Sequence, residues 1–237
     1  MNYFAHALPF LDDPYFAAGT GVPDWLTVVD RAVRVREKHA EPFVHDADPA
    51  TAAVARGVIQ HVRDDACFHQ TRAFAELSLG LSASVREFLG EEPGFRAPFL
   101  GHLLVEVLLD ASLIAENRAG LEAYYEVIES VDAGVIEEAV NRMAPRKTKR
   151  LAVMISRFSE ARILWDYLED AKLMRRLNQV MRRAKLAELP ERFGDFLPEA
   201  RRRVAERKAE LLESLPTEPL AELGVRIDLG EKPCDLE

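Results

Sequence analysis

The chain has 237 residues, a length that suits one large domain or one domain with a short appendage. Its residues are 48% hydrophobic and 30% charged, so a sizeable core and a solvated surface are both expected, and the net charge of −9 argues against broad nucleic-acid binding. Two cysteines, Cys67 and Cys234, argue against a disulfide framework and favour a reducing cytoplasm.

The distribution of apolar residues predicts an all-α fold. Alternating runs of β-branched residues are nearly absent, while Ala, Leu, Glu and Arg dominate. The longest apolar runs are interrupted well short of about 18 residues, so we expect no membrane span and no signal peptide. We expect one helical domain over residues 1–215 and an irregular tail over residues 216–237, in which V-R-I-D-L is a candidate short strand.

The apolar start M-N-Y-F-A-H-A-L-P-F-L contains two polar exceptions, Asn2 and His6, four residues apart. Such groups either face the surface or are held by a partner inside the protein.

A break in regular structure is predicted next, at Gly19, Gly21 and Pro23. Asp24 then stands at the start of a helix expected to run to about Lys38. An acid at a helix start is either a cap or first-turn residue with no further role, or a metal ligand.

A polar stripe follows the helix predicted over residues 49–80. His61, Asp65 and His69 are spaced four and four, and each step of four advances about 400° on a helix, so their side chains form one slowly drifting stripe. Gly57 indicates a close approach by another element. The stripe is either a set of polar residues on a helix surface or a set of ligands for a cation.

A second stripe, His102, Glu106 and Asp110, repeats this spacing in the helix predicted over residues 98–116. That helix is apolar on nearly every side, so we expect it to be buried. Buried imidazoles and carboxylates are costly unless they are paired, protonated or bound to a metal. The alternatives are satisfied hydrogen bonds in a core, or a metal-sized polar nest between the two helices.

The remaining helices are predicted over residues 81–89, 120–130, 133–143, 147–186 (bent or split near Asp170) and 197–212. Residues 142–185 contain 13 Lys/Arg against 4 Asp/Glu, a local balance of +9. This basic run is either a solvated helix face or a surface for an acidic partner. There is no Walker loop, G-x-S-x-G elbow or C-x-x-C pair, so serine or cysteine nucleophilic catalysis has no support.

An ordered set of short motifs resembles the acyl carrier protein phosphodiesterases, which are all-helical and distantly related to the HD-type metal-dependent phosphohydrolases. M-N-Y-F-A-H resembles their M-N-[FY]-L-A-H, A-G-T-G-V-P-D-W their G-N-x-x-x-D-[FW], and G-V-I-Q-H-V-R-D-D their G-I-x-x-H-R-x-I-D. E-V-L-L-D-A-S-L resembles their D-x-x-[WY]-D-H-F-L, and N-R-M-A-P-R their N-x-M-A-x-R. Order and approximate spacing agree from residue 1 to about residue 210.

The resemblance implies a single-domain helical bundle of the HD-like phosphohydrolase type. Its expected reaction is hydrolysis of the phosphodiester that joins 4′-phosphopantetheine to a serine of an acidic carrier protein, in the cytoplasm and within fatty acid biosynthesis. The expected cofactor is a divalent metal, most often Mn²⁺. The implied metal ligands are Asp24, His61, Asp65 and Asp110, which suit a Mn²⁺-like ion as mixed imidazole and carboxylate donors.

Other positions are given roles around the ion. His69 or His102 is expected to protonate the leaving alkoxide, and Glu106 to orient a ligand. Asn2, His6 and Arg146 lie at matched motif positions and are expected to contact the substrate or support the site.

Some residues depart from the family pattern: Thr20 replaces Asn, His69 replaces Asp, Ala111 replaces His, and His102 is an addition. These departures put the substrate in question more than the metal. The alternatives are a phosphohydrolase acting on another phosphoester and a non-catalytic helical protein that binds a partner through the basic run. Haem or di-iron binding has little support, because no Glu-x-x-His pair is present.

Overall fold

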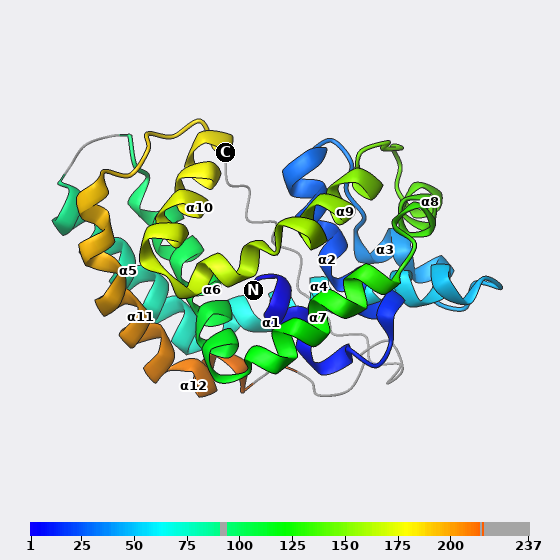
Figure 1. The fold of residues 1–237 in the computed structure, drawn as a ribbon, viewed down its shortest axis with the longest axis horizontal. Helices are drawn as coiled ribbons and strands as arrows, with labels where there is room; N and C mark the ends of the chain where they lie inside the picture. Colours follow the sequence, from blue (N-terminus) through cyan, green and yellow to red (C-terminus); the bar gives the residue numbers. More distant parts are fainter. Residues whose placement is uncertain (91–93, 214, 216–237) are drawn as a thin grey trace.

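The computed structural model describes residues 1–90, 94–213 and 215, and over these residues the chain is a single all-α helical domain without strands (Figure 1). The prediction of a single all-α domain is therefore confirmed. The helices are α1 (Tyr3–Ala7), α2 (Pro14–Val29), α3 (Glu37–Ala40), α4 (Pro49–Gln70), α5 (Arg72–Leu89), α6 (Ala97–Glu116), α7 (Arg118–Ser130), α8 (Ala133–Met143), α9 (Leu151–Ala161), α10 (Asp170–Arg183), α11 (Leu197–Glu206) and α12 (Lys208–Leu212). Short 3₁₀ turns cover Leu8–Phe10, Glu41–Phe43, Ile163–Leu168 and Glu191–Phe196.

The short helix α1 lies near the middle of the domain, with α5, α11 and α12 on one side of it and α3 and α8 on the other (Figure 1). Its aromatic residues pack into the core: Tyr3 lies 4.7 Å from Phe158 and 6.2 Å from Trp25 between ring centroids, and Phe4 lies 6.1 Å from Tyr124. All five rings are buried. Burial of each such side chain contributes roughly 1.5–3 kcal/mol, which holds the start of the chain inside the fold.

Two glycines set the close packing of α2 on α4. A Cβ on Gly57 would lie 2.9 Å from the Cα of Gly19 and would also collide with the carbonyl oxygen of Phe16. Only a residue without a side chain fits there, as the sequence predicted for Gly57. The close approach brings the backbone of α2 next to the middle of α4.

The predicted break at Gly19, Gly21 and Pro23 is wrong, because all three residues lie inside α2. The helix begins at Pro14, where the side chain of Asp13 accepts a hydrogen bond from the backbone N–H of Phe16. Glycines that look like breaks in sequence are instead required by tight packing between helices. For example, a Cβ on Gly19 would lie 2.7 Å from the carbonyl oxygen of Val54 on α4, whereas Gly21 makes room for the ring of Trp25 within α2 itself.

As a result, Asp24 occupies the interior of α2 and not a helix start. It therefore has no capping role, and the helix that follows it ends at Val29 and not near Lys38.

The helix predicted over residues 49–80 is in fact two helices, separated at Thr71. Thr71 has extended backbone angles, φ −64° and ψ 141°, and its hydroxyl accepts the backbone N–H of Phe74 at 3.1 Å. A threonine that caps the next helix in this way competes with continuation of the first. His69 consequently lies in the last turn of α4, where the chain turns toward α5.

The other predicted helices agree closely with the structure. The 133–143 and 98–116 predictions match α8 and α6, and the expected split of the 147–186 run occurs as α9, a 3₁₀ turn and α10. The last helix is divided at Arg207 into α11 and α12. The tail over residues 216–237, with its candidate strand, lies outside the described residues.

Helix α6 is long and apolar enough, by length and composition, to cross a membrane. In this domain, however, it packs against α5 and α11 and is largely buried. We interpret it as the core helix of the bundle.

Candidate metal centre

Asp110, on α6, anchors helix α1. Its Oδ2 accepts the backbone N–H of Phe4 at 3.0 Å, and its Oδ1 accepts that of Ala5 at 2.9 Å. Burial raises the pKa of Asp110 to about 7, although the two N–H groups oppose this shift. Asp110 thus positions the segment that carries His6, and its expected role as a metal ligand stays a prediction.

Asn2 also serves α1. Its side-chain oxygen accepts the backbone N–H of Tyr3, and its Nδ2 donates to the hydroxyl of Tyr167 at 3.1 Å. The polar exceptions at the start of the chain are therefore both held by partners inside the protein.

Buried His6 and His61 and half-buried Asp65 form a group that we call the inner cluster. His6 Nε2 lies 3.3 Å from Asp65 Oδ1, and His61 Nε2 lies 3.5 Å from Asp65 Oδ2. The two imidazole rings are stacked, with centroids 4.0 Å apart. One donor atom from each residue lies within 4.8 Å of the others, a spacing that would admit a metal ion between them.

The far nitrogens of both rings are fixed by hydrogen bonds. His61 Nδ1 lies 2.8 Å from the carbonyl oxygen of Thr20, which can only accept, so this nitrogen carries the proton and Nε2 is left with a lone pair in the neutral ring. His6 Nδ1 lies 3.3 Å from Asp64 Oδ2, and Gln60 donates to the other oxygen of Asp64 at 2.7 Å. Partners of this kind orient the imidazoles of metal sites.

Two buried polar atoms beside this cluster are incompletely satisfied within the described part of the chain: Asp24 Oδ2 has no hydrogen-bond partner, and His6 Nε2 has only its 3.3 Å ion-pair contact with Asp65, without hydrogen-bond geometry. The burial of Asp24 raises its pKa, although the neighbouring imidazoles of His61 and His6 oppose the shift. An unsatisfied buried polar group costs about 1–3 kcal/mol, and a cation would satisfy both atoms. The residues present therefore fit a divalent metal held by imidazole and carboxylate donors.

Positive charge already surrounds Asp65. The Met1 ammonium lies 2.7 Å from its Oδ1. Burial alone would raise the pKa of Asp65, but the ammonium and the imidazoles outweigh burial and hold this pKa well below its usual value. Burial opposes a charge on His6, but Asp64 and Asp65 outweigh it and raise the pKa of His6 to about 9. In the ion-free protein, the protonated imidazole of His6 and the Met1 ammonium supply positive charge to the inner cluster.

His69, His102 and Glu106 form a second group, which we call the outer cluster. His69 Nε2 and His102 Nε2 each lie 3.1 Å from Glu106 Oε1. Burial alone would raise the pKa of Glu106, but the Met1 ammonium and the two imidazoles lower it. The side chains of His69, His102 and Glu106 are 33%, 40% and 18% exposed, so this cluster is open to solvent.

The structure divides the stripe His61, Asp65 and His69 between the two clusters, so the three side chains do not meet at one point. His61 and Asp65 belong to the inner cluster, whereas His69 joins the outer one. Residues spaced by four drift by about 40° per step around a helix, and α4 ends one residue after His69. His69 therefore points toward the outer cluster. The stripe of α6 behaves similarly, running from buried Asp110 to half-exposed His102.

A cavity of about 320 Å³ lies next to Glu106 of the outer cluster, whereas His6, His61 and Asp65 of the inner cluster are not on its lining. Met1, Asp24 and Glu106 are on its lining, and so are three arginines: Arg157 from α9, and Arg176 and Arg183 from α10. Arg176 is paired with Asp166 at 2.7 Å. Among the described residues, no carboxylate forms an ion pair with Arg157 or Arg183. Carboxylates and free guanidinium groups thus line the same cavity.

Arg146 is exposed in the loop after α8, and no contact between it and either cluster exists among the described residues. Its motif has a structural role: Asn141 exchanges hydrogen bonds with the backbone of Thr148, and Arg142 pairs with Asp46 at 2.6 Å. The predicted contribution of Arg146 to the site stays untested.

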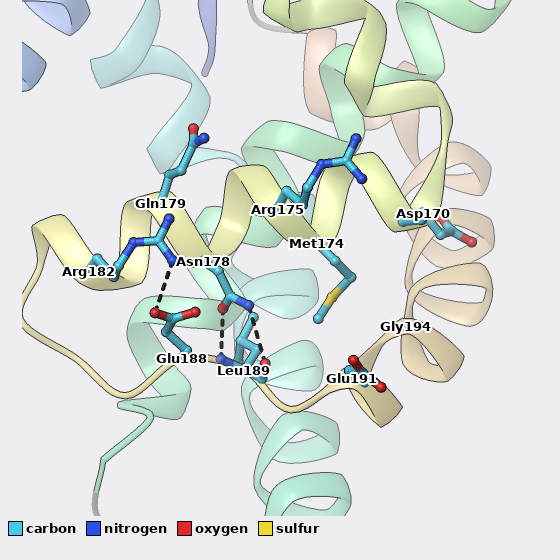
Figure 2. A pocket seen from close by; sticks show the side chains of 11 residues that line it. Asp170, Met174, Arg175, Asn178, Gln179, Arg182, Glu188, Leu189, Glu191 and Gly194 are labelled. Atoms are coloured by element: carbon cyan, nitrogen blue, oxygen red, sulfur yellow. Dashed lines mark hydrogen bonds and ion pairs between the residues drawn. The ribbon is translucent and has the colours of Figure 1, made fainter.

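Much of the basic run is neutralised by acidic neighbours. Figure 2 shows a second cavity, about 670 Å³ in volume, between α10 and the loop that follows it, where Arg182 pairs with Glu188 at 2.9 Å. Asn178 there exchanges hydrogen bonds with the backbone of Leu189 (Figure 2). Its lining carries both signs of charge, with Asp170 and Glu191 beside the arginines.

Comparisons with known proteins return no family model, no curated protein and no solved structure that matches this chain.

Sequence reasoning missed two contributors to the site: the carbonyl of Thr20 and the carboxylate of Asp64. A backbone carbonyl leaves no signal in a sequence. Asp64 lies outside the stripe spaced four and four, so its contact with His6 could not be read from the spacing. The arginines of the cavity belong to the basic run over residues 142–185, which the sequence identified as a possible surface for an acidic partner.

Proposed function

We propose that this chain is a divalent-metal-dependent phosphoester hydrolase of the HD-like type. One observation carries the proposal: the cavity lined by Asp24, which lies beside the inner cluster, and by Glu106 of the outer cluster is also lined by Arg157, Arg176 and Arg183. Imidazole and carboxylate donors favour a metal ion, whereas guanidinium groups favour a phosphate, and the two together match the needs of phosphoryl chemistry.

The metal would be held by His6, His61 and Asp65, with Asp24 as a fourth donor. Mixed imidazole and carboxylate donors suit Mn²⁺ better than Ca²⁺. When bound, such an ion supplies Lewis acidity at a phosphoryl oxygen and lowers the pKa of a bound water.

The chain's own residues have separate tasks. Arg157 and Arg183 would bind the phosphate oxygens and hold the ester against the clusters. Thr20 and Asp64 keep the Nε2 atoms of His61 and His6 turned toward Asp65.

The substrate we propose is the phosphodiester of a carrier protein that bears 4′-phosphopantetheine. Two features support it: the motif resemblance that runs along most of the chain, and the arginines from α9 and α10 that meet at the cavity and would attract an acidic protein. A smaller phosphoester is the rival substrate.

The test uses untagged protein stripped with a chelator and reloaded with Mn²⁺. Holo carrier protein is the first substrate, followed by intact-mass spectrometry for loss of the phosphopantetheine group, and bis(p-nitrophenyl) phosphate is the second. We expect Mn²⁺-dependent turnover of the carrier protein, reduced at least about 100-fold in His61→Ala and Asp65→Asn. The exposed His45, outside both clusters, provides the matched control His45→Ala.

Turnover of bis(p-nitrophenyl) phosphate without turnover of the carrier protein would overturn the proposed substrate but would retain the proposed phosphoester hydrolysis. Absence of turnover of both substrates, with no metal bound by the wild-type protein, would overturn the proposed function and favour a non-catalytic binding protein.

A further inference from the structure

We propose that the outer cluster, His69, His102 and Glu106, is a second metal site that takes a Zn²⁺-like transition-metal ion independently of the inner cluster. The inference concerns ion binding, and it does not depend on the proposed hydrolase activity.

The first argument is the spacing of the donor atoms. In a tetrahedral zinc site with bonds of about 2.0–2.1 Å, neighbouring ligand atoms lie about 3.3 Å apart. The Nε2 atoms of His69 and His102 are each 3.1 Å from Glu106 Oε1, and all three atoms lie within 4.8 Å of one another. The ligand atoms are therefore already separated by about the edge of such a site.

The second argument is an excess of hydrogen-bond donors. Glu106 Oε1 is approached by His69 Nε2, by His102 Nε2 and, at 3.3 Å, by the Met1 ammonium. One carboxylate oxygen has two lone pairs and cannot accept three good hydrogen bonds. If both imidazoles instead present lone pairs, they need a cation between them, and the conflict disappears.

The third argument is the way the rings are held. The buried ring of Phe74 packs against both imidazoles, with centroid distances of 4.6 Å to His69 and 5.0 Å to His102. His102 and Glu106 are one turn apart on α6, while His69 comes from the end of α4. A rigid apolar backing and donors from two helices favour a preformed site over a mobile surface group.

Solvent access and donor type decide which ion is favoured. Two imidazoles and one carboxylate are the set of ligands found in zinc hydrolases, with a fourth position left open. The side chains of His69 and His102 are 33% and 40% exposed, so an ion can enter and water can occupy the open position. Imidazole-rich sites prefer Zn²⁺ and similar transition metals to Mg²⁺ or Ca²⁺.

The experiment counts ions and locates them. Untagged full-length protein is stripped with a chelator and titrated with Zn²⁺ by calorimetry, and with Co²⁺ by its visible absorption bands, with bound metal confirmed by elemental analysis. We expect two equivalents in the wild type and one in His102→Ala and in His69→Ala, with affinity at the lost site weakened at least about tenfold.

A second set of variants separates the two sites. His61→Ala should also bind one equivalent, but with the Co²⁺ spectrum of the outer cluster retained, whereas His61→Ala/His102→Ala should bind none. His45→Ala is the matched control and should bind two. Since His102 is 40% exposed, its replacement leaves the fold intact, which a far-UV melting curve verifies.

Two results would overturn the second site. One is a wild-type protein that binds a single equivalent, lost equally in His61→Ala and His102→Ala, which would mean one shared centre. The other is a His102→Ala protein that still binds two equivalents. In either case His69 and His102 would be left with the proton-transfer role expected from the sequence.

Discussion

His61 donates a hydrogen bond from its Nδ1 to the backbone carbonyl of Thr20, across the contact between α4 and α2. The bond selects which nitrogen of His61 faces Asp65, so the chemistry of the inner cluster depends on how closely two helices approach. Thr20 stands next to Gly19, and Gly57 is one turn before His61. The packing and the site are therefore coupled through these neighbours.

Replacement of Gly57 by alanine should damage both packing and site. The new Cβ would collide with the backbone of α2 at Phe16 and Gly19, and overpacking against backbone costs about 1–3 kcal/mol. We expect a lower midpoint of urea unfolding, and weaker metal binding because the Thr20 carbonyl is displaced. Gly194→Ala is the control: nothing lies within 4 Å of its Cβ position, so its midpoint should change little. Equal midpoints for the two variants would contradict the coupling.

Asp110→Asn should loosen helix α1. An asparagine has one acceptor oxygen and a donor NH₂, so one of the backbone N–H groups of Phe4 and Ala5 loses its acceptor in a buried place, at a cost of about 1–3 kcal/mol. We expect a matching drop in the free energy of unfolding and weaker metal binding, since His6 is on α1.

The control for this variant is Asp132→Asn. Asp132 is an exposed aspartate that likewise accepts two backbone N–H groups, from Gly134 and Val135. Asparagine caps helices about as well as aspartate, so stability should change by less than about 0.5 kcal/mol. Equal losses of unfolding free energy in Asp110→Asn and Asp132→Asn would contradict the anchoring role of Asp110.

The metal-free protein should lose stability as the pH rises through the titration of His6. The pKa of His6 is raised from 6.5 to about 9 in the folded protein, so the stabilisation is complete below pH 6.5 and is lost as the pH approaches 9, a change of about 3 kcal/mol. Urea unfolding in the presence of a chelator, at several pH values between 6 and 9, measures this slope.

Below about pH 7 Asp110, whose pKa is raised to about 7, keeps a slope of its own, but His6→Gln removes the titrating imidazole and should flatten the curve between about pH 7 and pH 8. Burial lowers the pKa of the Met1 ammonium, but nearby Glu106 and Asp65 outweigh burial and raise it from 8.0 to about 11. The ammonium therefore contributes to the pH dependence of stability only above about pH 8. A slope in the variant that equals that of the wild type would assign the dependence to other groups.

Arg157→Ala and Arg183→Ala should weaken binding of phosphate groups. Each removes a guanidinium that lines the cavity, so we expect KM for a phosphodiester to rise about tenfold with a smaller change in kcat, and inorganic phosphate to inhibit less. Arg146→Ala, an exposed arginine in the loop after α8, is the control. An unchanged KM in both Arg157→Ala and Arg183→Ala would exclude the cavity as the substrate site.

How far the sequence predicts this protein depends on which interactions decide each feature. Helix spacing on α6 and α8 is a local property, and those boundaries follow from the sequence. The interior position of Asp24 depends on a continuous α2, in which Gly19 packs against the distant residues Val54 and Gly57, a tertiary effect that local rules interpret as a break. The same holds for Thr71: its side chain caps α5 and ends α4, although the apolar pattern of the sequence runs on without a break.

The composition of the two clusters shows the same limit. Spacing identified His61, Asp65, His69, His102 and Glu106 as candidates, but their division into two groups depends on the helix end after His69. The participation of His6 depends on Asp110, more than a hundred residues away in sequence. Only the fold brings these partners together.

The anchoring of α1 by Asp110 also sets the order in which the molecule can be assembled during synthesis. A ribosome releases His6 long before Asp110, so α1 can pack on α2 early but has no carboxylate anchor until about half of the chain has emerged. Until then the backbone N–H groups of Phe4 and Ala5 lack the acceptor that they have in the folded domain. The position of His6 relative to α4 is consequently fixed only after α6 has been made.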